Sequence, residues 1–409
     1  MRLISLALVL GSVAAAADPE YHTRRESLSR AIPQAVLAFF GGTQTKEDLA
    51  RFFQEPNFYY LSGWKQPGAT LLIDPERQIL FLPHHNAEFE KFHGPQAAPE
   101  DSGVREVAGF DTVLPLERFE NELHASLERW PALYTAGDEG RARLRPFAPL
   151  RDVQDAQTAL AHLRMQKSPA EIALLERAVA VTIAAHRAAW KQAAAGKYEY
   201  QIAAAAQAVY LDAGCERSAY PPIVGSGPNA IYLHYVRNER RMLAGELVLM
   251  DAGAECAGYT ADVTRTIPVS GRFSARQREL YEIVLGAEKA AIAAVKPGMT
   301  IGSTTPHSLS QVARDYLDAH GKDWHGEPLG KYLTHGISHH IGLEVHDAAD
   351  AGEPLEAGMV ISVEPGIYIP EENIGIRIED EVLVTGDGAK VLTAALPREA
   401  ADIERVLAK

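Results

Sequence analysis

Two pairs of acidic residues occupy matched positions in two segments that have the pattern of β-hairpins. In the first segment, two apolar strands flank small residues that can turn at Cys256 and Ala257, which would place Asp251 opposite Asp262. Residues that face each other across an antiparallel pair have Cβ atoms about 5 Å apart, and like charges there are destabilising. A cation bound between the two carboxylates would remove this repulsion.

The second segment repeats the arrangement. A turn at Glu371 and Glu372 would place Glu364 opposite Glu379. A single acid on a strand is usually a solvent-facing residue, but two matched pairs indicate a metal site. Carboxylate ligands favour Mn²⁺, with Zn²⁺ or Co²⁺ as substitutes. Carboxylates that bridge would hold two divalent metal ions roughly 3.5–4 Å apart.

Histidines gather in a third segment. Residues 335–347, HGISHHIGLEVHD, contain four of the fifteen histidines. An isolated histidine is more often a surface or core residue than a ligand, but a cluster in the same domain as two acid pairs indicates metal binding or proton transfer. Gly336 and Gly342 disfavour a helix, so we expect a loop or a bent strand. A weaker signal is the glycine-rich segment 225–229, which leads to His234.

These residues fall in a predicted C-terminal domain, residues 166–409. Its first helix is predicted to begin with a capping box at Ser168, followed by Pro169, and to stop near Gly196. The other predicted elements are helices at 200–213, 275–295 and 309–320 and strands at 219–224, 246–251, 359–364 and 374–384. Helices that cover one side of a mostly antiparallel sheet make this domain α+β.

The preceding region, residues 18–165, is predicted to be a smaller α/β domain. Strands are predicted at Phe58–Leu61, Thr70–Ile73 and Ile79–Leu82, and a helix at Phe119–Arg129. The region contains no nucleophile elbow, phosphate loop or dinucleotide fingerprint. The catalytic chemistry is therefore expected in the C-terminal domain.

The N-terminal residues 1–17 have the pattern of a secretory signal peptide. Arg2 precedes an apolar run and alanines at 14–16. No later apolar run is long enough to span a membrane. We therefore expect an exported protein, periplasmic if the source is Gram-negative, without stable membrane association.

Charge and cysteine content narrow the range of partners and metals. The formal charge of −14, from 54 acidic and 40 basic residues, disfavours nucleic acid as a partner. An oxidising compartment would permit a disulfide between Cys215 and Cys256, but two buried thiols are the expected state. Two cysteines are too few for a zinc–thiolate site, so a metal here needs oxygen and nitrogen ligands.

The motifs resemble those of the aminopeptidase P and prolidase family of pita-bread metallopeptidases. The matching C-terminal segments are DAGAECAGYTADVTRT (251–266), HGISHHIGLEVHD (335–347), VEPGIYIP (363–370) and GIRIED (375–380). NFYYLSGWKQPGATLLI (57–73) and LFLPHHNAEFE (80–90) are similar to the N-terminal domain of aminopeptidase P. The resemblance implies a pita-bread catalytic domain that follows a creatinase-type N-terminal domain.

The resemblance also implies the roles of individual residues. The implied metal ligands are Asp251, Asp262, His339, Glu364 and Glu379. The implied catalytic residues are His234, His335, His346 and Glu364, and Tyr368 and Arg377 would support substrate binding. Glu364 is implied in proton transfer, and either His346 or His335 in hydrogen bonding to the tetrahedral oxyanion. The resemblance also implies assembly into a homodimer or homotetramer.

Two activities of the family differ in what they require of the site. A dipeptidase must bind the carboxylate of its substrate and therefore needs a nearby cation. Between His346 and Glu364 the chain has no Lys or Arg. We therefore expect a Xaa-Pro aminopeptidase that acts on peptides with proline second. The alternative is a Xaa-Pro dipeptidase, and a third reading, an exported pita-bread binding protein, is disfavoured by the complete ligand set.

Overall fold

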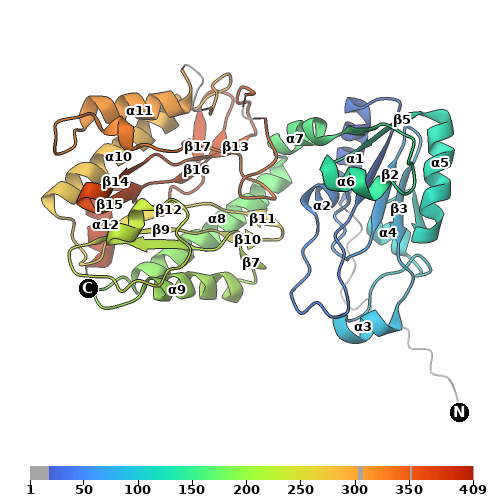
Figure 1. Ribbon diagram of the computed structural model, residues 1–409, viewed down its shortest axis with the longest axis horizontal. Helices are drawn as coiled ribbons and strands as arrows, with labels where there is room; N and C mark the ends of the chain where they lie inside the picture. The colour runs from blue at the N-terminus through green and yellow to red at the C-terminus, as the bar shows by residue number, and fades with distance from the viewer. Residues whose placement is uncertain (1–17, 303–306, 351, 409) are drawn as a thin grey trace, which may run out of the picture. The chain divides into compact units, whose positions relative to one another are not determined.

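The computed structural model describes residues 18–302, 307–350 and 352–408, and the predicted signal peptide, residues 1–17, lies outside the described residues. The chain divides into two compact units, Met1–Leu163 and Arg164–Lys409 (Figure 1). The division lies next to the predicted domain boundary at residues 165–166. Among the described helices, none is both long and apolar enough to cross a membrane.

The N-terminal unit contains a six-stranded mixed sheet with strand order β4-β3-β2-β1-β5-β6. The strands are β1 Ala35–Phe40, β2 Thr70–Ile73, β3 Gln78–Leu82, β4 Thr112–Pro115, β5 Ala132–Thr135 and β6 Val153–Asp155. The helices are α1 Pro19–Ala31, α2 Pro56–Ser62, α3 Ala87–His93, α4 Val104–Ala108, η1 Leu116–Arg118, α5 Phe119–Arg129, α6 Gly137–Leu144 and α7 Gln157–Met165. The core of this unit forms where α5 packs on the sheet, with Phe119 edge-on to Phe81 at 5.4 Å between ring centroids.

The predicted strand at Phe58–Leu61 is wrong, because these residues form part of helix α2. Pro56 occupies the first turn, and the Glu55 carboxylate caps the helix by accepting the backbone N–H of Phe58 at 2.5 Å. Gly63 ends the helix with a φ of 65°. A run of four apolar residues does not distinguish a buried strand from a buried helix, so the cap and the proline decide the outcome.

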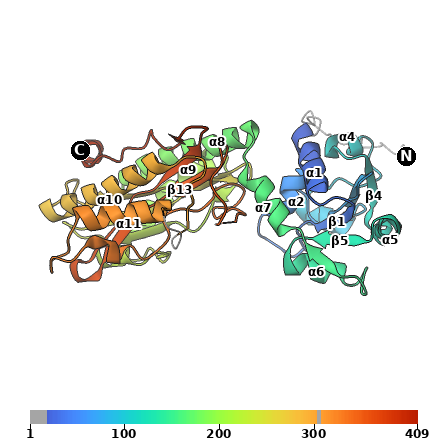
Figure 2. The same cartoon turned by 90° about the horizontal axis from the view of Figure 1, so that it is seen from above.

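The C-terminal unit has five α-helices among the described residues. They are α8 Pro169–Trp190, α9 Glu199–Asp212, α10 Ala275–Ala294, α11 Leu309–His320 and α12 Ala400–Leu407. The predicted capping box of α8 is present, since Ser168 Oγ accepts the N–H of Glu171 at 3.1 Å and the Glu171 carboxylate accepts the N–H of Ser168 at 3.0 Å. Helix α8 lies beside α9, and α10 lies beside α11 (Figures 1 and 2).

The strands of the C-terminal unit pair antiparallel throughout the described residues. They are β7 Arg217–Ser218, β8 Ile223–Ser226, β9 Leu247–Asp251, β10 Ala254–Cys256, β11 Tyr259–Thr260, β12 Thr264–Pro268, β13 Val360–Val363, β14 Gly366–Ile369, β15 Ile374–Arg377, β16 Asp380–Val384 and β17 Ala389–Val391. Short 3-10 helices lie at η2 Gly227–Ile231, η3 Leu329–Tyr332 and η4 Pro370–Glu372. The predicted strand 219–224 therefore begins later, and the predicted strand 374–384 is interrupted at residues 378–379.

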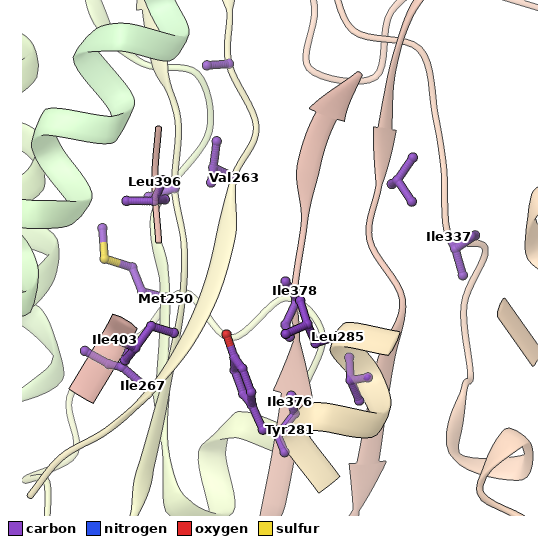
Figure 3. Close-up of a cluster of buried hydrophobic side chains, with 14 of the residues drawn as sticks. Met250, Val263, Ile267, Tyr281, Leu285, Ile337, Ile376, Ile378, Leu396 and Ile403 are labelled. Atoms are coloured by element: carbon purple, nitrogen blue, oxygen red, sulfur yellow. The ribbon is translucent and has the colours of Figure 1, made fainter. Parts of the chain in front are cut away.

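One large apolar core supports these strands from the helical side. Met250 and Ile267 from the β9–β12 hairpin, Tyr281 and Leu285 from α10, and Ile376 from β15 belong to the same buried cluster (Figure 3). Residues alternate between the two faces of a strand. The neighbours of these core residues, including Asp251 beside Met250 and Arg377 beside Ile376, therefore point to the opposite face.

The two acidic hairpins differ in how well their register was predicted. The second register is correct, since Gly366 pairs with Arg377 and Val363 pairs with Asp380, which brackets Glu364 and Glu379. In the first hairpin, Asp251 pairs with Thr264 instead of Asp262. The turn is centred one residue later than predicted, at Ala257 and Gly258, which both have positive φ.

This two-residue slip keeps both aspartates on the same face of the hairpin, because side chains alternate with a period of two. Asp262 now lies across from Gly253, diagonal to Asp251. A Cβ atom on Gly253 would lie 1.6 Å from the carbonyl oxygen of Ala261, so only glycine allows this close approach of the strands. The aspartates are therefore neighbours despite the incorrect register.

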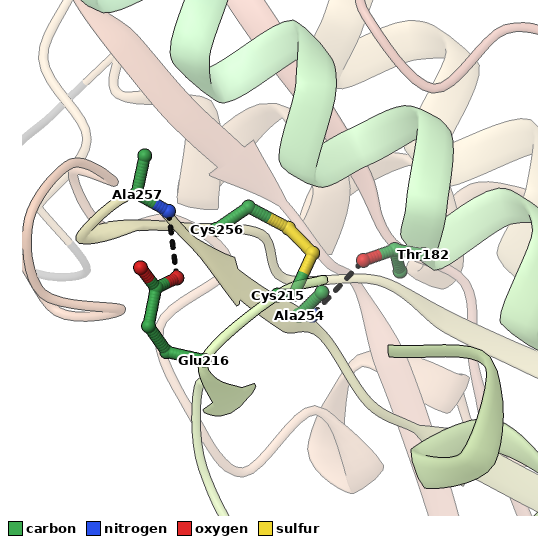
Figure 4. Close-up of a disulfide and its surroundings, with 6 residues drawn as sticks. All are labelled: Thr182, Cys215, Glu216, Ala254, Cys256 and Ala257. Carbon is green, nitrogen blue, oxygen red and sulfur yellow. Dashed lines mark hydrogen bonds between the residues drawn. A yellow bond between two sulfur atoms is a disulfide. The ribbon is translucent and has the colours of Figure 1, made fainter. Parts of the chain in front are cut away.

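Cys215 and Cys256 form a disulfide, so the expectation of two free thiols is wrong (Figure 4). Their Cα atoms are 4.3 Å apart, across 41 residues of sequence. The bond fastens the tip of the β9–β12 hairpin to the residues that follow α9. Sequence spacing gives no information about this proximity, which arises because β7 pairs with β10.

Candidate metal centre and active site

Four carboxylates and one imidazole converge on the face opposite the apolar core. Possible ligand atoms of Asp251, Asp262 and Glu379 lie within 4.8 Å of one another, and so do those of His339, Glu364 and Glu379. These five residues are the predicted metal ligands. They come from the β9–β12 hairpin, the loop before β13 and the two sides of the β14–β15 hairpin, so three separate chain segments build one site.

Asp251 and Asp262 are joined by a residue that the sequence analysis missed. The hydroxyl of Tyr220 is hydrogen-bonded to a carboxylate oxygen of each aspartate. Burial, followed by the two negative charges, raises the pKa of Tyr220 well above its usual value, so the phenol keeps its proton. The phenol has one proton, so it can donate to only one of the two carboxylate oxygens, and the other oxygen needs a different donor or a cation.

Glu364 and Glu379 are positioned by hydroxyl groups of the neighbouring strands. Ser362 Oγ contacts Glu364 Oε1 at 3.2 Å, and Thr264 Oγ1 donates to Glu379 Oε2 at 2.7 Å. The other oxygen of Glu379 is buried without a hydrogen-bond partner among the described residues. A buried carboxylate oxygen without a donor is costly unless a cation neutralises it.

His339 presents one ring nitrogen to the acids. Its Nε2 lies 3.3 Å from both Asp262 Oδ2 and Glu364 Oε1. Its Nδ1 lies 3.1 Å from the carbonyl oxygen of His340, which can only accept a hydrogen bond, so Nδ1 carries a proton. In the neutral ring, Nε2 then offers its lone pair to the centre of the site, as a metal ligand requires.

The electrostatics of the cluster fit a bound cation. Burial raises the pKa of Asp262 and Glu379 above their usual values, and their negative neighbours add to this effect. Burial also raises the pKa of Glu364 to about 7, against the opposing influence of His339 and Arg377. Divalent ions among these oxygens would reverse these shifts and hold all four carboxylates ionised. The donor set of carboxylates and one imidazole suits divalent metal ions.

Arg377 and Tyr368 form a hydrogen-bonded group beside the carboxylates. Arg377 Nη1 donates to the hydroxyl of Tyr368 at 2.8 Å, Nη2 donates to Asp251, and Nε contacts Thr264 Oγ1 at 3.1 Å. The Tyr368 hydroxyl also lies 2.9 Å from His335 Nε2. Arg377 therefore fixes Asp251 and Tyr368, and through Tyr368 it fixes the ring of His335.

The remaining predicted histidines surround the same cluster. His335 Nδ1 lies 3.9 Å from Glu364 Oε2, and the ring of His346 stacks on that of His339 with centroids 4.0 Å apart. Burial lowers the pKa of both His335 and His346 to about 4, and the charge of His234 acts in the same direction on both. His234, exposed on the loop after η2, is thus within electrostatic reach of the site.

A second missed residue lies behind the ligands. Glu381 is fully buried on β16, and its Oε1 accepts the backbone N–H of Asp262 at 2.8 Å. No local pattern marks Tyr220 or Glu381. Tyr220 precedes two prolines in an irregular segment, and Glu381 follows two other acids in the sequence EDE. Their roles depend on contacts with residues more than 30 positions away.

Comparison with known proteins places this geometry in a family. Residues 173–386 match metallopeptidase family M24, and residues 21–134 match the aminopeptidase P N-terminal domain. A Xaa-Pro aminopeptidase of Haemophilus influenzae is 34% identical, over 95% of this chain and 97% of the relative. The chain belongs to metallopeptidase family M24.

Two further similar proteins carry the names of two different activities. The structure of aminopeptidase P from E. coli with the inhibitor Pro-Leu has a TM-score of 0.84 at 28% identity, covering 95% of this chain and 97% of that one. A Xaa-Pro dipeptidase of Pyrococcus horikoshii is 32% identical, over 85% of this chain and 92% of the relative. The M24 chain is thus a hydrolase of peptide bonds, with an α+β pita-bread domain after an aminopeptidase-P-type N-terminal domain, as predicted.

Proposed function

We propose that this M24 enzyme is a Xaa-Pro aminopeptidase, which releases the first residue of peptides that have proline second. The observation that carries the proposal is the convergence of all five predicted ligands in one cluster, in a chain that Xaa-Pro aminopeptidases match over nearly its full length. A binding protein has no need to hold three buried carboxylates and one partly buried carboxylate together.

The bound group is proposed to be a pair of divalent ions, with Mn²⁺ preferred and Zn²⁺ or Co²⁺ as substitutes. Asp251, Asp262, His339, Glu364 and Glu379 would hold the ions. When bound, such ions lower the pKa of a water molecule and polarise the scissile carbonyl. Loading the purified protein with each of the three metals, followed by metal analysis and peptidase assay, tests the preference.

The protein's own side chains supply proton transfer and positioning. Glu364 can accept a proton on its carboxylate, and His335 Nδ1 lies 3.9 Å from Glu364 Oε2. His346, neutral because its pKa is about 4, can donate one hydrogen bond to the oxyanion that develops from the carbonyl. His234, whose ring is exposed, is proposed to contact the peptide backbone.

The dipeptidase activity is the second candidate, and the Pyrococcus horikoshii relative favours it. Against it, Arg377 is buried and already bonded to Asp251 and Tyr368, so it does not offer a free cation to a dipeptide carboxylate. An unpaired carboxylate in the site is costly, whereas a longer peptide continues with a neutral amide. We expect kcat/KM for Gly-Pro-Pro to exceed that for Gly-Pro by at least about tenfold, which corresponds to about 1.4 kcal/mol. Equal or faster hydrolysis of Gly-Pro would instead establish a dipeptidase.

Export to an oxidising compartment and assembly into a homodimer or homotetramer are also proposed. The disulfide between Cys215 and Cys256 supports export, because disulfides persist mainly outside the cytosol. N-terminal sequencing of the protein from its native host should find a start near Ala17 or Asp18, and an intact Met1 would contradict export. Light scattering coupled to gel filtration measures the oligomeric state.

A further inference from the structure

The loop that carries His346 has little secondary structure to hold it. This segment, residues 340–347, forms one isolated bridge to β13, between His340 and Ile361. The carbonyl of Gly342 also accepts hydrogen bonds from the N–H and hydroxyl of Thr260, at 2.9 and 3.0 Å. These contacts fix the first half of the loop. The half that ends in His346 needs a separate anchor.

That anchor is the side chain of Asp347. One carboxylate oxygen accepts a hydrogen bond from Arg164, and the other accepts one from Lys167 Nζ at 2.9 Å. The three side chains are only 1–2% exposed. The backbone N–H of Asp347 donates to the carbonyl of His340 at 2.9 Å, which closes the loop.

The space around Asp347 is closed as well. A Cβ atom on Gly342 would lie 2.1 Å from Asp347 Oδ2, so the carboxylate fills the place that a side chain would take. Although burial disfavours the charge, Lys167 and Arg164 hold the pKa of Asp347 below its usual value. Removing one member of such a buried group leaves an uncompensated charge, which is strongly destabilising to the local arrangement.

His346 depends on this anchor because no hydrogen bond to its ring is found among the described residues. The ring stacks on His339, and one of its nitrogens lies within 4.8 Å of a carboxylate oxygen of Asp262 without a hydrogen bond between them. The direction in which the ring points is therefore set by the backbone, and Asp347 is the next residue. Displacing that backbone would move a hydrogen-bond donor relative to the scissile carbonyl.

We propose that Asp347, held by Arg164 and Lys167, is the positioning residue for His346 in the peptidase reaction. The inference rests on the proposed function, in which His346 stabilises the oxyanion. In this role Asp347 acts through His346, and its side chain, 2% exposed, is closed off from solvent. A misplacement of about 1 Å at a catalytic group can cost on the order of 10²-fold in rate. Asp347→Asn should therefore lower kcat by roughly 10- to 100-fold and change KM little.

A double-mutant cycle in the Mn²⁺-loaded, full-length enzyme tests the proposal. His346→Ala should lower kcat on Gly-Pro-Pro, and adding Asp347→Asn to His346→Ala should lower it no further. If Asp347→Asn reduces kcat by the same factor with and without His346, or only lowers the melting temperature, the positioning role is refuted. If His346→Ala itself retains full kcat, the proposed role of His346 fails instead, which is a separate result.

A matched control and a milder variant complete the test. Glu344 bonds to the same Arg164 at 2.9 Å, but its side chain is 49% exposed, so water can replace it. Glu344→Gln should change kcat less than twofold, and a loss equal to that of Asp347→Asn would refute the proposal.

If Asp347→Asn fails to fold, Lys167→Met keeps Asp347 and Arg164 paired. Lys167→Met should lower kcat less than Asp347→Asn does, and this loss should disappear when His346→Ala is also present. A loss that persists in the His346→Ala background would refute the proposal.

Discussion

Replacing Glu364 by Gln should stabilise the metal-free protein at alkaline pH and destabilise the metal-loaded one. Burial raises the pKa of Glu364 to about 7 in the folded, metal-free protein, from a usual value of 4.5. The folded state therefore binds a proton more tightly than the unfolded state. As pH rises from 4.5 to 7 the unfolded state loses its proton first, so the free energy of unfolding falls, and above 7 the loss is complete.

The size of the effect follows from the same values. The change from 4.5 to about 7 corresponds to about 3 kcal/mol, at ~1.4 kcal/mol per tenfold change in proton affinity. This is a ceiling, because an empty cluster can relax and admit water. Gln carries no titrating proton and mimics the neutral acid. For a unit of this size, about 3 kcal/mol raises the melting temperature by roughly 6–12 °C.

The assay is thermal unfolding of chelator-stripped protein at pH 5 and pH 8. The transition to follow is the one that Mn²⁺ shifts, which identifies the C-terminal unit. Without metal at pH 8, Glu364→Gln should melt above the wild type, and near pH 5 the difference should be small. With Mn²⁺ the order should reverse, because binding stabilises only the protein that retains its ligands.

Glu371, an exposed acid in the turn of the same hairpin, provides the control. Glu371→Gln should leave the melting temperature unchanged at both pH values, with and without Mn²⁺. A stripped wild-type protein that is as stable at pH 8 as Glu364→Gln would refute the reasoning. That result would show that ionising Glu364 in the metal-free cluster does not lower the free energy of unfolding.

Three further predictions concern the metal site, the disulfide and specificity. Asp262→Ala should abolish metal binding and activity while the circular dichroism spectrum is retained, and bound metal at the wild-type level in this variant would contradict the ligand assignment. Replacing Cys215 and Cys256 together by Ala should lower the free energy of unfolding by about 4 kcal/mol, the loop-closure value for a sequence separation of 41, as measured by denaturant titration. Asp350→Arg should increase kcat/KM for Gly-Pro several-fold and leave that for Gly-Pro-Pro unchanged, and a parallel change in both would argue against a carboxylate effect.

The sequence alone determined those features that local pattern controls. The capping box at Ser168 started α8, because a helix N-terminus is satisfied by side chains within one turn. The turn near Glu371 fixed the register that brings Glu364 and Glu379 together, because a short loop leaves few ways to pair two strands. The ligand set was recognised from its motifs, and the fold followed from that recognition.

The meeting of distant segments depends on tertiary packing. Tyr220 joins Asp251 to Asp262, and Arg164 reaches Asp347 across 183 positions, through contacts that no periodicity encodes. The register of the first hairpin differs from the predicted one by two residues, and the site is preserved because such a shift keeps both aspartates on the same face. The sequence pattern does not distinguish these two registers. These contacts form because burial of the apolar core brings the polar faces of separate elements together. Their partners are thus set by packing and not by neighbours in the chain.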